Sequence, residues 1–491
     1  MKSFLHIILV ALVGWCVCGC GKPDNPSGGK EPATPRLSLM NSAITFEAEG
    51  GTISVSFLAN KAWTVSSDQS WLNLNPPSGS GSEAGQSVSV VATANAGAER
   101  TAKVTFRMGE LSAELSVSQK KDPSYMPTTS ISEFKTKPVD EVTWYKLTGE
   151  IASIANEEYG NFYVFDQTGY VYVYGLCEKQ VGKGGNDQSF PKLKLKVGDS
   201  VTMMTLRSEY NGTIEAGGQT PAYLVSKTAG EYKLGRKVAS TTAGWLELPA
   251  TSAGDKQDLL IHSVPDGNRN YAAYWDYDNL VASWVAYPLC ATNIGSGGRT
   301  DSFSLDPLLS RDKQPYLPKP YQEGNAGMYD RGHQIPSADR LDWRVNLETF
   351  FSTNMTPQDN GLNSEAWGTL ENKVRAWARN SATDTLYVVT GCTGADVKTK
   401  YVLDYEGKHV AIPAGYYKAL LRLSKDKEYM ALGIYFDNAA NNAASIRKDM
   451  VMSIDDLEKK VGVDFFVNLP DDVEKSVEAQ NPAEVSWWWN N

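Results

Sequence analysis

Polar and apolar residues alternate along much of residues 37–121. The clearest runs are residues 53–57 (ISVSF), 88–90 (VSV) and 104–106 (VTF). A period of two residues places successive side chains on opposite faces of a strand. Clusters of Pro, Gly and Asn at 75–79 and 95–97 separate these runs and favour turns. The pattern predicts a small β-sandwich.

Residues 128–233 carry the same period around a hairpin signal. Apolar residues alternate at 162–164 and again at 171–173, on either side of the turn sequence DQTG. A short turn between two alternating runs is typical of paired strands. A further strand-like run, KVGDSVTM, follows. We predict a second β-rich unit here.

The pattern changes within residues 240–491. Strand-like runs occupy residues 284–287, 385–390 and 417–423, and helix-like runs occupy residues 365–380 and 454–461. In the first helix apolar residues recur at Trp367, Leu370, Val374 and Trp377, which is the spacing of one helical face. Mixed strands and helices predict an α+β domain. A length of 491 residues fits about three domains, and no internal repeat relates the three units.

The N-terminus predicts export. Lys2 precedes an apolar stretch, residues 4–17, that is too short for a comfortable membrane span. The stretch ends in VCGC, and a small residue before Cys20 resembles a bacterial lipobox. The resemblance implies a signal peptide over residues 1–20 and a lipidated Cys20, and the alternative is a secretory leader without a lipid. Residues 21–36, rich in Gly, Pro and Ser, predict a flexible tether.

Net charge and cysteine content limit the function classes. A net charge of −10 and a pI of about 5.2 argue against a nucleic-acid partner, because phosphate binding is mainly electrostatic. A local basic cleft suffices for an enzyme that releases its product, so the net charge does not exclude a nuclease. After the leader only Cys177, Cys290 and Cys392 remain, too few for a disulfide framework. A disulfide between Cys290 and Cys392 requires that the fold makes them neighbours.

The strongest chemical signal is the sequence DRGHQIP at residues 330–336. An isolated histidine is most often a structural residue, but His333 is followed by a second polar pattern. Asn363 and Glu371 are eight residues apart (371 − 363), and Arg375 lies four beyond Glu371. On a helix these three side chains share one face. A row of amide oxygen, carboxylate and guanidinium suits a site for a hydrated cation and a phosphate better than it suits a packed core.

Several separated blocks resemble the DNA/RNA non-specific endonuclease family of ββα-metal (His-Me finger) nucleases. The resemblance covers most of residues 270–475. Its blocks are WVAY (284–287), GGRTD with LDP (297–307), DRGHQIP (330–336), STNMTPQ (352–358), LNSEAW (362–367), LYVVTG (386–391), AIPAGYYKALL (411–421) and NLPDD (468–472). The resemblance implies an endonuclease domain over residues 240–491.

The resemblance implies roles for the polar residues around the metal. His333 matches the general base that takes a proton from the attacking water. Asn363 matches the one direct protein ligand of Mg²⁺, with Mn²⁺ as the alternative ion, and Glu371 matches a carboxylate that binds the ion through water. The chemistry agrees, because an imidazole has an ordinary pKa of about 6.5 and Mg²⁺ keeps most of its waters.

The resemblance also implies four supporting residues. Arg299 matches the arginine that stabilises the charge on the pentacovalent phosphorus. Arg331 and Arg375 match arginines near the scissile phosphate and the leaving group, and Asn354 matches an asparagine with a supporting role. Arginines along a phosphate oppose the charge that grows in the transition state.

The two β-rich units have resemblances of their own. Residues 37–121 resemble the BACON family of immunoglobulin-like modules, which implies a glycan partner. Trp63 and Trp71 then form either a sugar platform or part of the core, and the size of the module favours the core. Residues 128–233 resemble an OB-fold barrel. Its four tyrosines, Tyr163, Tyr170, Tyr172 and Tyr174, either stack on nucleic acid or serve ordinary packing.

The sequence therefore predicts an exported, Mg²⁺-dependent, sugar-non-specific endonuclease that hydrolyses the phosphodiester bonds of DNA and RNA. A lipid at Cys20 would anchor it in the outer membrane, facing the periplasm or the cell surface. The alternative is a surface glycan-binding lipoprotein whose third domain is a degenerate nuclease scaffold; loss of His333 or Asn363 would favour it, and both are present. The tail Trp487-Trp488-Trp489 is expected to pack or to be disordered rather than to bind a ligand.

Overall fold

The structure is a computed structural model that describes residues 34–122, 125–185, 187–232, 244–251, 256–263 and 269–490. The predicted signal peptide with its Cys20, and most of the predicted tether, lie outside the described residues. Two compact units divide the chain, residues 1–127 and 128–491. Within the described ranges no helix combines the length and the apolar character needed to cross a bilayer.

The first unit is built from two sheets that share one core. One sheet has the order β1 (Leu37–Leu39), β3 (Gly51–Ala59), β7 (Ser82–Ala92), β5 (Leu72–Asn75). The other has the order β2 (Ala43–Phe46), β9 (Leu111–Gln119), β8 (Arg100–Met108), β4 (Trp63–Ser67), β6 (Ser78–Gly79). Alternate residues of both sheets, such as Phe57 and Val90 from one and Phe106 and Val117 from the other, fill the space between them. The strands predicted from the period of two are confirmed.

The two tryptophans of this unit take different positions. Trp63 is buried in the core, where its ring meets the edge of Phe57 at 4.7 Å and its Nε1 donates to Gln86. Trp71 is partly buried, and the guanidinium of Arg100 covers its ring at 4.5 Å. The core role is confirmed for Trp63, which is therefore not part of a sugar platform.

The second unit begins with a closed five-stranded barrel. Its order is β10 (Trp144–Asn156), β11 (Asn161–Asp166), β12 (Gly169–Cys177), β14 (Thr213–Thr228), β13 (Ser200–Tyr210), which pairs with β10 again. Only the β12–β14 pair is parallel. The predicted hairpin joins β11 to β12, and Asp166 Oδ1 accepts from the backbone N–H groups of Thr168 and Gly169. Helices α1 (Ile131–Thr136) and α2 (Phe190–Leu193) add Phe134 and Phe190 to the barrel core.

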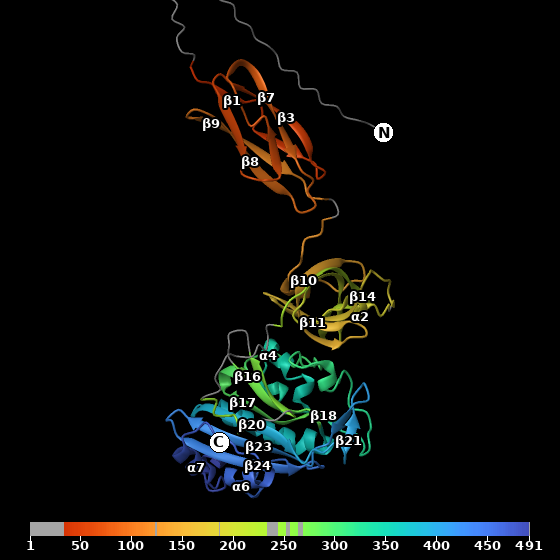
Figure 1. Cartoon of the computed structure of the whole chain (residues 1–491), viewed down its shortest axis with the longest axis vertical. Coiled ribbons are helices and arrows are strands. Elements are labelled where there is room, and N and C mark those ends of the chain that lie inside the picture. Colours follow the sequence, from red (N-terminus) through yellow and green to blue (C-terminus); the bar gives the residue numbers. More distant parts are fainter. Residues whose placement is uncertain are drawn as a thin grey trace, which may run out of the picture. The chain divides into compact units, whose positions relative to one another are not determined.

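A seven-stranded antiparallel sheet organises the rest of the second unit (Figure 1). Its order is β15 (Gln257–Ser263), β16 (Arg269–Asp276), β17 (Val281–Leu289), β20 (Thr383–Thr393), β23 (Gly415–Ser424), β24 (Tyr429–Asp437), β25 (Val451–Met452). The alternation along β23 shows the two faces, because Leu420 packs in the core of α5 (Gly368–Arg379) and Leu421 packs in the core of α6 (Ile454–Val461) and α7 (Asp471–Glu478).

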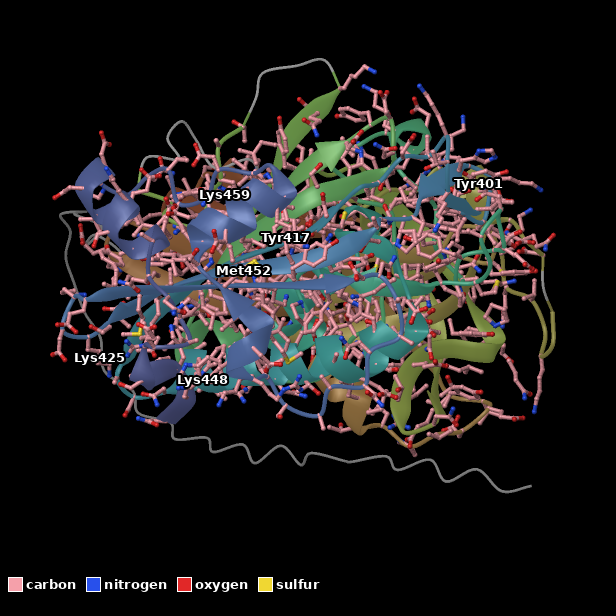
Figure 2. All side chains as sticks on the ribbon, turned by 90° about the horizontal axis from the view of Figure 1, so that it is seen from below. Tyr401, Tyr417, Lys425, Lys448, Met452 and Lys459 are labelled. Atoms are coloured by element: carbon pink, nitrogen blue, oxygen red, sulfur yellow. The ribbon has the colours of Figure 1, made fainter. Side chains whose placement is uncertain are left out.

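The side-chain view shows the second of these layers. Tyr417 lies against Phe465 between β23 and the helices, and Lys459 on α6 points to solvent (Figure 2). The helix predicted at 454–461 is confirmed at both ends. It begins after Ser453, which caps the N–H of Asp456, and ends at Gly462 in the left-handed region.

The C-terminal tryptophans pack on the opposite side. Helix α8 (Ser486–Asn490) buries Trp488 against Trp377 of α5 at 4.8 Å, and Arg422 covers Trp487 at 3.7 Å. The packing role expected for this tail is confirmed. Cys290 and Cys392 both carry free thiols, so the disulfide left open by the sequence is not formed.

Candidate active site

The DRGH motif forms a short strand. β18 (Asp330–His333) pairs with β19 (Met355–Gln358) in an antiparallel register that sets Asp330 opposite Gln358 and His333 opposite Met355. A Cβ at Gly332 would overlap the side chain of Gln358, so this position admits only glycine without displacing β19. The motif is thus a packed strand of a two-stranded sheet with His333 at its end.

Asn354 fastens the segment that follows His333. It is fully buried, its Oδ1 accepts from Ile335 N at 2.9 Å, and its Nδ2 donates to the carbonyls of Ile335 and Thr349 at 3.0 and 2.7 Å. Its backbone carbonyl also accepts from Gln334 N. The predicted supporting role of Asn354 therefore takes the form of holding the backbone beside His333.

Asn363 is tied to the other end of the same strand. Its Nδ2 donates to Asp330 Oδ2 at 3.0 Å, and Asn360 Nδ2 donates to the same oxygen at 3.0 Å. None of the described residues donates to Asn363 Oδ1. Asp330 and His333 are three residues apart on one strand, a spacing of about 10 Å. The structure thus places His333 at one end of the β18–β19 pair and connects the amide of Asn363 to the other end, at Asp330.

Asn363 lies in a π-helical turn, η4 (Leu362–Trp367), that runs directly into α5. The N–H of Ala366 donates to the carbonyl of Asn441, not to the carbonyl four residues before it. A π-helical turn is a distortion that is common at functional sites. The predicted helix is confirmed over α5, and its predicted start is a π turn.

Glu371 and Arg375 project from α5 beside two residues that the sequence did not single out. Burial raises the pKa of Glu371, and the positive charges of Lys418 and Arg375 oppose that rise. Burial lowers the pKa of Lys418 and Glu371 opposes it, so each group favours the charge of the other. Arg375 Nη1 donates to the buried Asp339 at 2.8 Å, which also accepts from Tyr287 Oη at 2.8 Å.

The imidazole of His333 is held between aromatic rings. Phe350 meets it at 5.0 Å with an interplanar angle of 88°, and Phe303 lies at 6.0 Å. Its Nε2 is buried and has no hydrogen-bond partner among the described residues. Burial, together with the charges of Arg299 and Arg331, lowers the pKa of His333 to about 3. The ring is therefore neutral at ordinary pH, which is the form that can accept a proton.

Arg299 links the two halves of the site. Its charge lowers the pKa of His333 and also lowers that of Glu371 on α5. Its guanidinium lies over Phe350 at 4.8 Å and donates to Asp301 at 2.6 Å. Arg331 lies over Phe303 at 3.4 Å and donates to the carbonyl of Leu317, and burial lowers its pKa to about 10. Arg299 thus connects His333 with Glu371, whereas Asn363 is connected to the DRGH motif through Asp330.

The barrel packs on the segment that carries Arg299. Tyr163 Oη donates to the carbonyl of Thr300 at 2.5 Å, and Ser153 and Ser302 are hydrogen-bonded through their hydroxyls. Tyr170 stacks on Trp343 at 4.8 Å. The start of this segment, Thr300, is also held by Asn346 Oδ1, which accepts from both its N–H and its hydroxyl.

This contact decides between the two interpretations of the barrel tyrosines. Tyr163, Tyr170 and Tyr172 belong to the cluster between the barrel and helix α4 (Trp343–Glu348), whereas Tyr174 is exposed. Their packing role is confirmed, and the predicted stacking surface for nucleic acid is reduced to Tyr174.

Comparison with known proteins identifies the family of this domain. A family model described as DNA/RNA non-specific endonuclease matches residues 261–472, and one described as a putative N-terminal binding domain, BACON, matches residues 61–120. A nuclease of Nostoc sp. is 31% identical over 221 residues, covering 43% of this chain and 76% of the relative. The chain belongs to the DNA/RNA non-specific endonuclease family.

Further relatives of this endonuclease are similar over the same region. A nuclease of Serratia marcescens is 30% identical over 203 residues, covering 40% of this chain and 73% of that protein. Mitochondrial endonuclease G of Bos taurus is 29% identical over 244 residues, covering 47% and 80%. The endonuclease is thus an enzyme of the nuclease class, with two β-rich modules ahead of the matched domain.

Four residues of the site were missed by the sequence interpretation. Asp330 stood inside the recognised motif, and its place three residues before His333 was a signal that was not used. Lys418 stands in the block AIPAGYYKALL, where a charged residue inside an apolar strand was a second signal. The sequence contains no comparable signal for Asp339 or Phe350.

Proposed function

We propose that this endonuclease is a Mg²⁺-dependent, sugar-non-specific enzyme that hydrolyses phosphodiester bonds of DNA and RNA, with His333 as general base. The observation that carries the proposal is the strand β18, which has a neutral His333 at one end and Asp330, the partner of Asn363, at the other, with Arg299 acting on both His333 and Glu371. The matched family description, which names both DNA and RNA, supports the substrate class.

The arrangement of Asn363 fits a hard cation. Asp330 takes the N–H of the amide, which leaves Oδ1 as an oxygen donor, and Glu371 is the carboxylate assigned to bind the ion through water. Mg²⁺ prefers few protein oxygens and keeps several waters. When bound, such an ion would polarise the phosphate and neutralise developing charge.

The protein's own residues supply the remaining steps. His333 accepts a proton from the attacking water, a role that requires the ring to be uncharged before the step, as its low pKa ensures. Arg299, Arg331 and Arg375 place positive charge along the phosphate, and Asp339 fixes the direction of Arg375. Because these contacts address phosphate and not base edges, little sequence preference is expected.

Three finer assignments of fold belong to this proposal. β18, β19 and α5 follow one another as two antiparallel strands and a helix, which supports a ββα-metal core. The barrel order β10-β11-β12-β14-β13, with its single parallel pair, supports an OB-fold. Two sheets over one core support an immunoglobulin-like module in residues 37–121.

We also propose export and anchoring of the enzyme in the outer membrane through a lipid on Cys20, facing the periplasm or the cell surface. The short apolar leader and the lipobox-like VCGC support this. Two observations weaken the glycan-binding alternative. Trp63 is buried and so cannot be part of a sugar platform, and the third domain has the complete set of polar site residues.

The proposal is tested by cleavage of supercoiled plasmid and of a single-stranded RNA, with Mg²⁺ and with EDTA. Wild type should cut both substrates and lose activity in EDTA. Asn363→Ala should be inactive with Mg²⁺, whereas Asn360→Ala, the exposed neighbour bonded to the same carboxylate, should retain activity. Undiminished cutting by Asn363→Ala, or by the chelated enzyme, would remove the basis of the proposal.

A further inference from the structure

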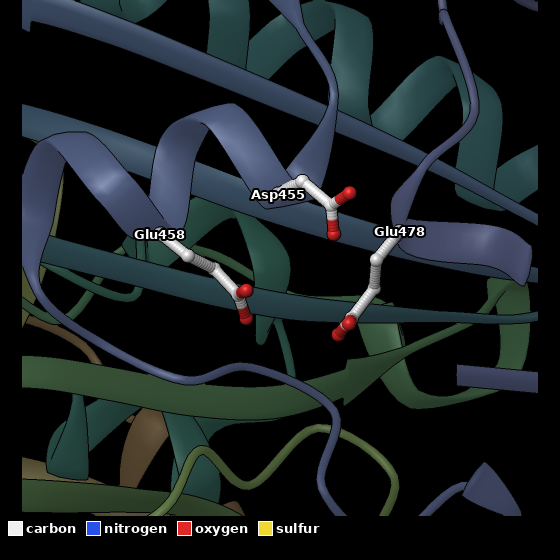
Figure 3. Close-up of side chains that lie close together, drawn as sticks. All are labelled: Asp455, Glu458 and Glu478. Atoms are coloured by element: carbon white, nitrogen blue, oxygen red, sulfur yellow. The ribbon is translucent and has the colours of Figure 1, made fainter. Parts of the chain in front are cut away.

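Helices α6 and α7 bring three carboxylates together on the face of the large sheet opposite α5. Asp455 and Glu458 are three residues apart on α6 and therefore share one side of the helix, and Glu478 is the last residue of α7. Their side chains converge, and one oxygen of each lies within 4.8 Å of the others (Figure 3). None of the three belongs to the site around His333.

Glu478 is buried without a partner. Only 6% of its surface is exposed, and its Oε1 has no hydrogen-bond partner in the part of the chain that the structure describes. Among those residues no basic side chain forms an ion pair with any of the three carboxylates. The nearby lysines of α6 are engaged elsewhere, since Lys459 pairs with Asp456 at 3.2 Å and Lys460 lies over the ring of Tyr435.

Such an arrangement is costly without a counter-charge. A buried carboxylate that lacks a partner loses its hydration and gains nothing in return. Burial raises the pKa of Glu478 to about 8, and the negative charges of Glu458, Glu474, Asp464 and Asp455 add to that rise. Five carboxylates therefore concentrate negative charge at one place, with the oxygen atoms of Glu478 at its buried end.

We propose that Asp455, Glu458 and Glu478 form a binding site for Ca²⁺. The donors are all carboxylate oxygens, the ligand type that Ca²⁺ prefers, and oxygens within 4.8 Å of one another can share an ion at Ca–O distances of about 2.3–2.6 Å. Asp455 and Glu458 are half-exposed, which leaves room for the waters that complete six to eight ligands. Mg²⁺ suits the site less, because it demands shorter bonds and a strict octahedron.

The consequence of binding is structural. Ile454, Leu457 and Val477 pack with the sheet in one core, so α6 and α7 are the cover of this face. Glu458 is also connected to the loop between the helices, since it accepts from Phe465 N at 2.7 Å. An ion shared by both helices would join their ends and resist their separation from the sheet.

The test uses the full chain carrying Asn363→Ala, which removes cation binding at the active site from the readout. The protein is treated with chelator, dialysed and titrated with CaCl₂ while heat release and melting temperature are measured. One Ca²⁺ should bind, and at a hundredfold excess over Kd the melting temperature should rise by about 5 °C. Glu478→Gln should weaken binding at least tenfold and abolish the rise.

Two further comparisons separate the site from general effects. In chelator, Glu478→Gln should melt no lower than its parent, because the substitution removes an unpaired buried charge; in CaCl₂ it should melt lower. Asp456→Asn, an exposed carboxylate on the same helix, should keep the response. The proposal would be overturned if Ca²⁺ stabilised the parent and Glu478→Gln equally. It would also be overturned if Ca²⁺ stabilised neither protein, in which case a proton on Glu478 neutralises the cluster.

Discussion

Two histidines of the nuclease domain lie in opposite electrostatic settings. His262 Nε2 lies 3.0 Å from Asp306 Oδ2, and both residues are fully buried. Burial opposes its charge, but Asp306 and Glu348 outweigh burial and raise its pKa. His333 has no carboxylate partner, and burial with Arg299 and Arg331 lowers its pKa.

The same two chain segments create this contrast. Residues 299–306 bring Arg299 to His333 and Asp306 to His262. Phe350 contacts His333, and the next residue, Phe351, contacts His262. A histidine held charged by an anion joins parts of a fold, whereas a histidine held neutral beside cations keeps the free lone pair that a general base needs. Residues that are neighbours in the sequence thus contact a structural histidine on one side and a catalytic candidate on the other.

The largest expected effect comes from removing the neutral histidine. His333→Ala should lower the rate of plasmid cleavage at saturating Mg²⁺ by about 10²–10⁴-fold, the range for loss of a general base. Its melting temperature should change little, because the ring makes no buried ion pair. The rate is measured by the loss of supercoiled plasmid, and wild-type rates in His333→Ala would end its assignment as the base.

The paired histidine should respond in the opposite way. His262→Ala leaves Asp306 buried without its partner and should lower the free energy of unfolding by about 3–5 kcal/mol. Below the temperature at which it unfolds, the variant should still cleave DNA at a rate close to wild type. Chemical denaturation with a parallel activity assay measures both, and a large rate loss in a folded His262→Ala protein would contradict the contrast.

The pH dependence of that stability difference follows from the two pKa shifts. The raised pKa of His262 gives stability that is present below its unfolded pKa of about 6.5 and is lost as pH rises through the folded value. The lowered pKa of Asp306 gives stability that is present above about pH 4 and is lost as pH falls through its folded value. The difference between wild type and His262→Ala should therefore be largest between about pH 4 and 6.5.

Arg299 tests the neutral state of His333 directly. Arg299→Ala should lower the cleavage rate by about 10²-fold through loss of charge near the phosphate. It should also raise the pKa of His333, because one of the charges that lower it is gone, so activity should fall at a higher pH on the acid side. A pH–rate profile measures this. Arg344→Ala, which removes an exposed arginine of the same domain, should leave the profile unchanged.

The smallest effect is expected from the barrel contact. Tyr163→Phe removes the donor to the carbonyl of Thr300, a loss of about 1 kcal/mol that should lower the rate a few-fold and move the acid side of the profile slightly upward. Tyr174→Phe changes an exposed tyrosine of the barrel and should do neither. Equal effects of both substitutions would show that the contact with Thr300 does not position Arg299.

The sequence predicted the features that depend on residues close to one another in the chain. The period of two predicted the strands of both β-rich units, and the predicted helix carries Glu371 and Arg375 on α5, whereas Asn363 lies in the π turn before it. The π turn at Leu362–Trp367 was not predicted, and the hydrogen bond from Ala366 to Asn441 in this turn joins segments that are distant in the sequence. An alternating pattern shows which tyrosines share a barrel face, but it does not show that Trp343 covers that face.

The different roles of the two histidines could not be predicted from the sequence either. His333 stood in a recognisable motif, whereas His262 stood in an ordinary strand, and its partner Asp306 is 44 residues away (306 − 262). The same holds for Lys418, because only the register of the sheet shows that its side chain points to the α5 side. These residues depend on contacts between distant segments, which periodicity does not encode.

The central claim is that His333 and the cation held by Asn363 act on the same phosphorus atom. A double-mutant cycle of His333→Ala and Asn363→Ala, read as single-turnover plasmid cleavage at fixed Mg²⁺, tests it most directly. We expect the double variant to be about as slow as the slower single variant, because either substitution disables the same step. Losses that multiply would mean that the two residues serve independent steps, and the account of the site would be wrong.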